Sequence, residues 1–254
     1  MDGFVLIMMS YFKRFFRDFK EVLLLIAIPV GLTVMWSLIN AGETVNGYNV
    51  NASFNAVPLM LSFQFFNAGI MIVYLFHDFR GEMRWRLLSM PRSLMSFVLP
   101  AFVANWMFSV VLGILVLIVS AVFLNAYLGN LLILAAVLLL VSLMATFISM
   151  LIFLYSKKLG SANGKTYIVS FGLMILSGYM IPLGNSPIVE FFNNYGTPLS
   201  LGARAVMYSG TLMDYLPNVE SRGMEQALIN VGILAAATLV IGIITIIATR
   251  RRKV

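Results

Sequence analysis

The sequence predicts an all-α polytopic membrane protein with six transmembrane helices, and three observations support this fold class. Hydrophobic residues make up 61% of the 254 residues and charged residues only 11%, whereas a soluble domain is roughly half apolar and about a quarter charged. Long intervals contain no ionisable residue. The lysines and arginines gather between those intervals, so the net charge of +7 reports membrane topology rather than nucleic-acid binding.

The intervals without charge define the expected spans. A charge at the bilayer centre costs roughly 2.5–3.5 kcal/mol on insertion scales, and about 20 apolar residues cross the hydrocarbon. The interval 44–76 opens with a polar turn at 46–51, and the interval 93–156 is too long for one span, so it turns back at the polar break 125–130. The expected spans are 22–42, 56–76, 94–124, 131–155, 166–185 and 226–249.

The distribution of basic residues predicts the orientation. Of the 17 lysines and arginines, only Arg204 and Arg222 fall on the side opposite the termini. By the positive-inside rule, both termini are therefore expected in the cytoplasm. The first apolar run is not expected to be a cleaved signal, because it lacks a small-residue cleavage site and amphipathic sequence precedes it.

Residues 4–20 are expected to form an amphipathic elbow helix. At 100° per residue the apolar and aromatic side chains share one side and the basic side chains the other. This separation predicts a helix lying flat in the cytoplasmic interface, with its aromatic face in the acyl boundary and its basic face toward anionic lipid. A plain topology anchor is the alternative. The interface residues expected are Met8, Phe12, Phe15, Phe16 and Phe19, with Lys13, Arg14 and Arg17.

The segment 78–91 is too charged to enter the bilayer, yet it carries an apolar stripe at helical spacing. The stripe consists of Phe79, Met83, Leu87 and Met90. Pro91 is expected to end this helix. A short amphipathic helix packs on the membrane surface or fits a groove of a soluble partner, and the residues alone leave both readings open.

Two further segments lie outside the spans. Residues 160–166 resemble a phosphate-binding loop, but only three residues separate the glycines where that motif needs four. We therefore expect a flexible basic loop there and no ATP hydrolysis by this chain. Residues 186–216 hold two apolar stretches too short to cross, which predicts a re-entrant helical pair broken at 194–198 that caps a pathway, with a surface-lying lid as the alternative. The expected outer-gate residues are Pro182, Pro187, Phe191, Phe192, Pro198 and Arg204.

The composition argues against several function classes. The chain has no cysteine and one histidine, His77, so thiolate, cysteine–metal and most imidazole chemistry is excluded. No expected span carries an ionisable residue, which disfavours an ion-driven transporter, a membrane-embedded enzyme and a passive channel with a polar ring. We expect no catalytic residue, metal or cofactor on this chain.

The order and spacing of these features resemble those of the ABC type-2 exporter permeases, over essentially the whole chain. The matching features are the basic elbow, the six spans, Arg80-Gly81-Glu82 followed by Leu88 and Pro91, the Ser177-Gly178 pair before Pro182, and Pro198 followed by Arg204. The resemblance implies that the segment 78–91 is a coupling helix that docks on a separately encoded ABC ATPase subunit. Its implied docking residues are Phe79, Arg80, Glu82, Met83, Arg84, Arg86, Leu87 and Met90.

The resemblance further implies two permease chains, identical or different, and two ATPase chains that bind ATP and Mg²⁺, in a bacterial cell membrane. The 17 methionines and 20 phenylalanines provide adaptable apolar surface for amphipathic peptides or lipophilic compounds. The build resembles permeases that export antimicrobial or cytolytic peptides, including phenol-soluble modulins. Export of a lipid or polysaccharide stays open as the alternative; an ATP-independent channel or an embedded enzyme is disfavoured, and no nucleic-acid partner is expected.

Overall fold

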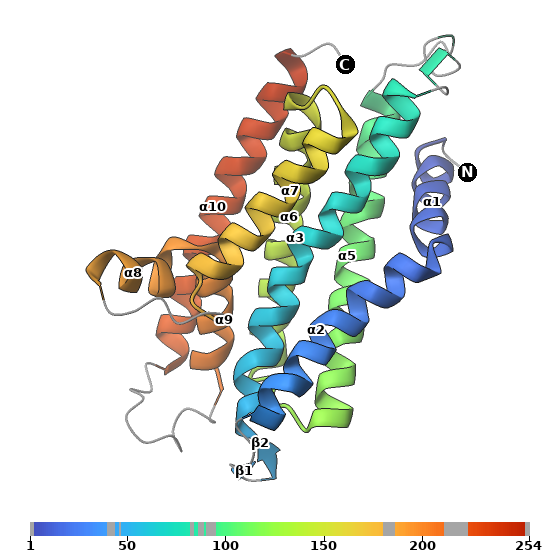
Figure 1. Cartoon of the computed structure of the whole chain (residues 1–254). Coiled ribbons are helices and arrows are strands. Elements are labelled where there is room, and N and C mark those ends of the chain that lie inside the picture. The colour runs from blue at the N-terminus through green and yellow to red at the C-terminus, as the bar shows by residue number, and fades with distance from the viewer. Residues whose placement is uncertain are drawn as a thin grey trace.

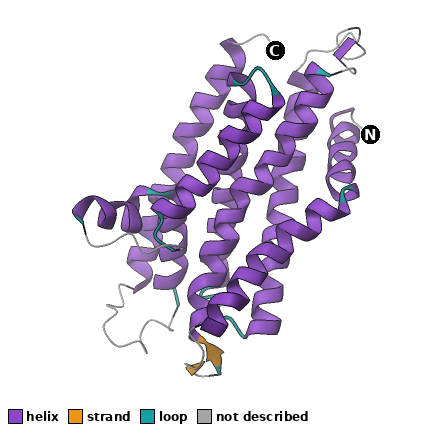
Figure 2. Ribbon diagram, viewed as in Figure 1, coloured by secondary structure: helices purple, strands orange, loops and turns teal. Residues whose placement is uncertain are grey.

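Helices account for nearly all of the computed structural model, which describes residues 3–39, 44–45, 47–81, 84–85, 89, 95–179, 186–210 and 223–251. Figures 1 and 2 show a bundle of long helices with a small hairpin at one end. The helices are α1 (Gly3–Arg17), α2 (Phe19–Ile39), α3 (Val50–Arg80), α5 (Met95–Leu124), α6 (Leu131–Tyr155), α7 (Leu159–Leu176), α8 (Pro187–Phe191), the π-helix η1 (Phe192–Gly196), α9 (Pro198–Tyr208) and α10 (Gly223–Arg251). The antiparallel strands β1 (Thr44–Val45) and β2 (Tyr48–Asn49) form the hairpin.

The helical, multi-pass fold is confirmed. Within the described residues five helices are long and apolar enough to cross a membrane, namely α2, α3, α5, α6 and α10. The sixth expected span, 166–185, begins within α7, which ends at Leu176, and its residues 180–185 lie outside the described part of the chain. The count of six spans therefore stays a prediction.

Two ends of the bundle are distinguished by their charges. Both termini lie at the upper end in Figure 1, and the exposed basic side chains of this end include Lys13, Arg17, Lys157, Lys158 and Arg250. We call it the basic end. The opposite end, the hairpin end, carries β1, β2 and the 125–130 loop (Figure 1).

Helix α3 is longer than predicted at both ends. The expected span began at 56, but α3 begins at Val50, because the Asn49 side chain caps it by accepting a hydrogen bond of 3.0 Å from the amide of Ala52. At its other end α3 continues to Arg80. Phe79 and Arg80 are therefore the last residues of the span helix, and the prediction of a separate helix starting at 78 is wrong in this respect. The turn predicted at 125–130 is confirmed, and Asn130 caps α6.

The prediction of a flexible loop at 160–166 is wrong, because these residues form the first turns of α7. The amide of Ala162 donates to the carbonyl of Lys158, and the hydroxyl of Thr166 donates to the carbonyl of Ala162. Ala162 is fully buried, and the Thr166 side chain approaches the α-carbon of Gly69 in α3. Small residues favour a loop in an isolated chain, but here they permit close helix packing.

Helix α3 is the centre of the bundle. It packs against α2, α5, α6, α7 and α9, and Figure 1 shows it running between α2 and α7. Most of its residues are buried. Near the basic end its core partners include Phe108 and Phe153, and toward the hairpin end they include Val137 and Leu199. Any displacement of α3 is therefore passed to several helices at once.

Helix α1 runs along α5 rather than presenting its whole aromatic face outward (Figure 1). Phe15 is only 1% exposed and its ring lies 5.5 Å from that of Phe108, so the prediction of an acyl-facing side chain is wrong for Phe15. Phe19 is 68% exposed but belongs to α2, because α1 ends at Arg17. Of the other predicted interface residues, Met8, Phe12 and Phe16 are half-buried, and Lys13 and Arg17 are exposed.

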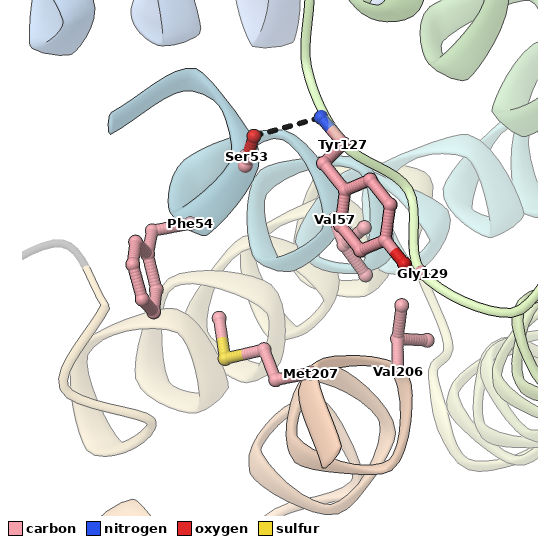
Figure 3. Close-up of a pocket in the computed structure, with 7 residues that line it drawn as sticks. All are labelled: Ser53, Phe54, Val57, Tyr127, Gly129, Val206 and Met207. Carbon is pink, nitrogen blue, oxygen red and sulfur yellow. Dashed lines mark hydrogen bonds between the residues drawn. The ribbon is translucent and has the colours of Figure 1, made fainter. Parts of the chain in front are cut away.

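A small cavity of about 30 Å³ lies at the hairpin end, where the start of α3, the 125–130 loop and the end of α9 meet. Figure 3 shows the Tyr127 ring between Val57 and Val206, with the Tyr127 amide donating to the Ser53 hydroxyl at 2.7 Å. Gly129 takes a φ of +67°, and a β-carbon there would lie 2.8 Å from the carbonyl oxygen of Val206. The loop thus requires glycine at this position.

We predict that Gly129→Ala destabilises the fold by about 1–3 kcal/mol, because the side chain meets both an unfavourable φ and a backbone oxygen. Thermal unfolding in detergent should show a midpoint lower by about 2–6 °C. Gly232→Ala in α10 is the control, since a β-carbon there meets nothing within 4 Å. Equal midpoints for the two variants would contradict this account of the loop.

Candidate functional site

A buried ion pair joins α1 to α3 near the basic end. The guanidinium of Arg14 donates two hydrogen bonds to the Asp78 carboxylate, from Nη1 at 2.8 Å and from Nη2 at 3.2 Å. The Tyr11 hydroxyl donates to the same carboxylate at 2.7 Å, and Nδ1 of His77 lies 3.3 Å from its other oxygen. Asp78 is 7% exposed. Because two parallel hydrogen bonds join the guanidinium to the carboxylate, the orientation of both side chains is fixed. A single contact between two charges would leave them free to rotate.

Aromatic and carboxylate groups extend this pairing. The Tyr74 hydroxyl donates to Asp18 at 2.7 Å and to the backbone carbonyl of Arg14 at 3.2 Å. The Arg14 guanidinium lies 4.8 Å from the Tyr74 ring centroid. Burial and the neighbouring Asp78 carboxylate raise the pKa of the Tyr11 phenol above its ordinary value, so this hydroxyl stays protonated and remains a donor. We call Tyr11, Arg14, Asp18, Tyr74 and Asp78 the elbow clamp.

Arg80, the last residue of α3, binds the C-terminal end of α6. The Arg80 guanidinium donates to the carbonyls of Ser156 and Phe153 and lies 4.6 Å from the Phe76 ring centroid. Lys165 of α7 donates to the carbonyl of Tyr155 and to the Ser156 hydroxyl, each at 3.2 Å. Two cations therefore satisfy the free carbonyls at the C-terminus of α6, where positive charge is favourable. We call this arrangement the α6–α7 corner.

These contacts correct part of the predicted docking set. Phe79 is 6% exposed and its ring lies against Phe153, so Phe79 faces the bundle and is not available to an outside partner. Arg80 contacts the end of α6 but remains exposed, so its docking role stays a prediction. Arg84 and Trp85 are exposed, and the amide of Ser89 donates to the carbonyl of Trp85, four residues earlier, as in an α-helix. The remaining predicted docking residues, Glu82, Met83, Arg86, Leu87 and Met90, lie outside the described residues.

Sequence reasoning missed both Trp85 and the elbow clamp. Trp85 is 76% exposed at the end of α3, and an exposed tryptophan beside a charged segment is a signal for a contact surface. For the clamp the signal was weaker. Asp78 stands next to an apolar span, where an acidic side chain needs a cation, and Arg14 sits on a helix expected at the same membrane face.

A groove opens between α2 and α7, with α3 as its floor. Its volume is about 300 Å³. Leu24 comes from α2, Phe66 and Ile70 from α3, and Thr166 and Tyr167 from α7. The Phe66 ring lies 5.0 Å from that of Phe171 and 6.3 Å from that of Tyr167. The wall is thus apolar and aromatic over most of its length, and Glu21 and Asn163 also line it.

The predicted pair of short helices on the far side consists of α8 with η1, followed by α9, and the change of direction falls at Thr197. Pro187 and Pro198 occupy first-turn positions of α8 and α9, where a missing amide costs nothing. Phe191 is 57% exposed and Phe192 half-buried. Whether the pair enters the membrane stays a prediction.

Helix α9 is the buried member of this pair. It packs against α3, α6 and α10, and a β-carbon at Gly202 would lie 2.8 Å from Val137. Arg204 donates to the Tyr208 hydroxyl at 2.8 Å. Pro182 lies outside the described part of the chain. Among the described residues no group of three or more potential metal-ligating side chains lies together.

Comparison with known protein families identifies the family of this chain. A family model described as ABC-2 type transporter matches residues 3–211, from α1 to just beyond α9. No curated protein matches the chain. The matched region contains the elbow clamp, the α6–α7 corner and the groove. The chain therefore belongs to the ABC-2 type transporter family and is a membrane permease subunit that works with an ABC ATPase.

Proposed function

We propose that this permease exports amphipathic peptides from the cytoplasm or inner leaflet of a bacterial cell membrane. Two permease chains, this one twice or with a related chain, would act with two ATPase chains, which bind the ATP and Mg²⁺. The basic end would face the cytoplasm, since positive charge is retained on that side. Both termini, the end of α3 and the α6–α7 corner share this end, as an ATPase acting from the cytoplasm requires.

The observation that supports coupling is the anchoring of the last turn of α3 on two sides. Asp78 binds α1 and Arg80 binds the end of α6, and the segment 82–91 follows directly. An ATPase that displaces this segment would therefore move α1, α3, α6 and α7 together. Without these contacts the end of α3 would yield locally, and the displacement would not reach the membrane.

Alternating access follows from the central place of α3. The helix forms the floor of the groove between α2 and α7, so a tilt of α3 changes the width of the groove. ATP binding would draw the two coupling segments of the dimer together and turn the cargo surface from one side of the membrane to the other. The outer pair α8–α9 would then act as the gate on the far side.

The cargo assignment is supported by the wall of the groove. Phenylalanine, isoleucine and leucine line it, and the Phe66, Tyr167 and Phe171 rings offer a broad apolar surface. A volume of about 300 Å³ accommodates a few side chains of one helical face rather than a whole sugar polymer. Amphipathic helices present such a face.

We expect Asp78→Asn to lower cargo transport several-fold in a reconstituted complex while ATP hydrolysis continues, because the neutral amide no longer pairs with Arg14. Breaking this ion pair costs more free energy than the loss of one hydrogen bond, because the charge of the partner is left without compensation. Arg14→Lys, which keeps the charge but loses the two-point geometry, should give an intermediate loss. Glu225→Gln in the first turn of α10, outside the clamp, the groove and the outer pair, serves as control. Full transport by Asp78→Asn would contradict the coupling role.

Met83→Asp or Leu87→Asp should leave membrane insertion intact and uncouple ATP hydrolysis from transport. A carboxylate placed in the apolar stripe of the coupling segment would be desolvated at the ATPase surface without a partner. Co-purification of the ATPase and the ratio of transported cargo to hydrolysed ATP are the measurements. Arg250→Asp, at an exposed position of the same end on α10 and outside the clamp and the α6–α7 corner, is the comparison. Unchanged transport at normal expression would count against docking through this segment.

The cargo class is tested by ATPase stimulation. The complex in lipid vesicles should hydrolyse ATP about two- to tenfold faster with amphipathic helical peptides than without, and scrambled peptides of equal composition should have little effect, because only a segregated apolar face fits the groove. A response to lipid-linked glycans with indifference to peptides would replace the proposal by lipid or polysaccharide export.

A further inference from the structure

The groove carries one charged side chain among its described lining residues, Glu21 in the first turn of α2. Leu24 stands one turn further along the same helix and also lines the groove. A carboxylate therefore lies about one turn from an apolar and aromatic wall. Such a pattern distinguishes ligands by the charge that accompanies their apolar face.

Charges of both signs lie near Glu21 in the chain, but among the described lining residues of the groove Glu21 alone is charged. In the described part of the chain Glu21 makes no ion pair and accepts no hydrogen bond. The half-buried guanidinium of Arg14, seven residues before Glu21, is held by Asp78. Asp18, three residues before Glu21, is held by the Tyr74 hydroxyl and adds a second negative charge. The neighbouring Arg17 and Lys20 are exposed.

We propose that Glu21 makes the groove select amphipathic peptides with a cationic group beside their apolar face. The proposal rests on the function proposed above and names the substrate class at the same site. The apolar side chains of the peptide would lie on Phe66 and Ile70, while a lysine or arginine side chain, or the terminal amine, would pair with Glu21. An anionic peptide with the same apolar face would place its carboxylates beside that of Glu21.

Charge complementarity decides between the occupants. A helix of neutral residues fills the apolar part but leaves Glu21 partly desolvated and unpaired, which is unfavourable. A phospholipid with an anionic headgroup seated in the groove would place its phosphate beside the Glu21 carboxylate, which is unfavourable. A cationic amphipathic helix satisfies both parts of the groove at once, because basic and apolar side chains three or four residues apart lie on one face.

The test uses the absence of cysteine from the natural chain. Leu24→Cys places one thiol in the groove, and Leu239→Cys, on an exposed face of α10, is the matched control. Two maleimide-bearing helical peptides with the same apolar face, one with lysines and one with glutamates on the polar face, are added to the assembled complex in phosphatidylcholine vesicles. The measured quantity is the rate of covalent labelling, with ATPase stimulation recorded in parallel.

The cationic peptide should label Leu24→Cys about two- to fivefold faster than the anionic peptide, a preference of the size of a partly exposed ion pair. The same ratio should fall to near one at Leu239→Cys, in the double variant Glu21→Gln/Leu24→Cys, and at high salt. Glu225→Gln/Leu24→Cys, with a remote glutamate changed, should keep the preference.

Three results would overturn the proposal. Equal labelling by the two peptides, with both stimulating ATP hydrolysis, would refute charge selection and leave peptide export standing. A preference that persists without the Glu21 carboxylate would refute the assignment to this residue. Labelling of Leu24→Cys no faster than that of Leu239→Cys would refute the groove as the binding surface, whereas loss of ATPase stimulation by both peptides would also remove the peptide-export function.

Discussion

The two-point ion pair between Arg14 and Asp78 is the contact on which the arrangement of the basic end depends. It joins an amphipathic helix that precedes the first span to the last turns of the second, and Tyr11 and Tyr74 hold its two sides in place. An unpaired carboxylate so deeply buried would be costly. The pair therefore fixes α1 against the bundle, and the aromatic packing of Phe15 on Phe108 follows from that position.

Helix α3 combines the roles that this constraint makes possible. One end is held by the elbow clamp and the α6–α7 corner, its middle forms the groove floor, and its start packs beside the 125–130 loop. In the proposed mechanism the coupling force, the cargo surface and the gate would all contact this one helix. A permease driven by a separate ATPase needs such a continuous element, because a displacement at one end reaches the other only where the helix is stiff enough to transmit it.

Much of the fold could be predicted from the sequence because the bilayer constrains it strongly. The spans beginning at Phe19, Met95, Leu131 and Gly223 follow from intervals without charge. The 125–130 turn follows because the interval 93–156 is too long to be a single span. Tertiary packing determines the features that the composition did not predict, namely the helix at 160–166 and the burial of Phe15. The segment from Gly160 onward forms a helix whose Ala162 and Thr166 are buried, with Thr166 beside Gly69 of α3, and Phe15 faces protein on the helix that the Arg14–Asp78 pair holds against the bundle. No local pattern pairs residues so distant in the chain.

The clamp also imposes an order on biogenesis. Arg14 and Asp78 are 64 residues apart in the chain, and during synthesis the first leaves the ribosome well before the second. Until the second span is inserted, Arg14 would lack the Asp78 partner that it has in the folded chain. The ion pair can then form only when α3 is inserted in the correct direction, because the opposite direction would place Asp78 and Arg14 on opposite faces of the bilayer.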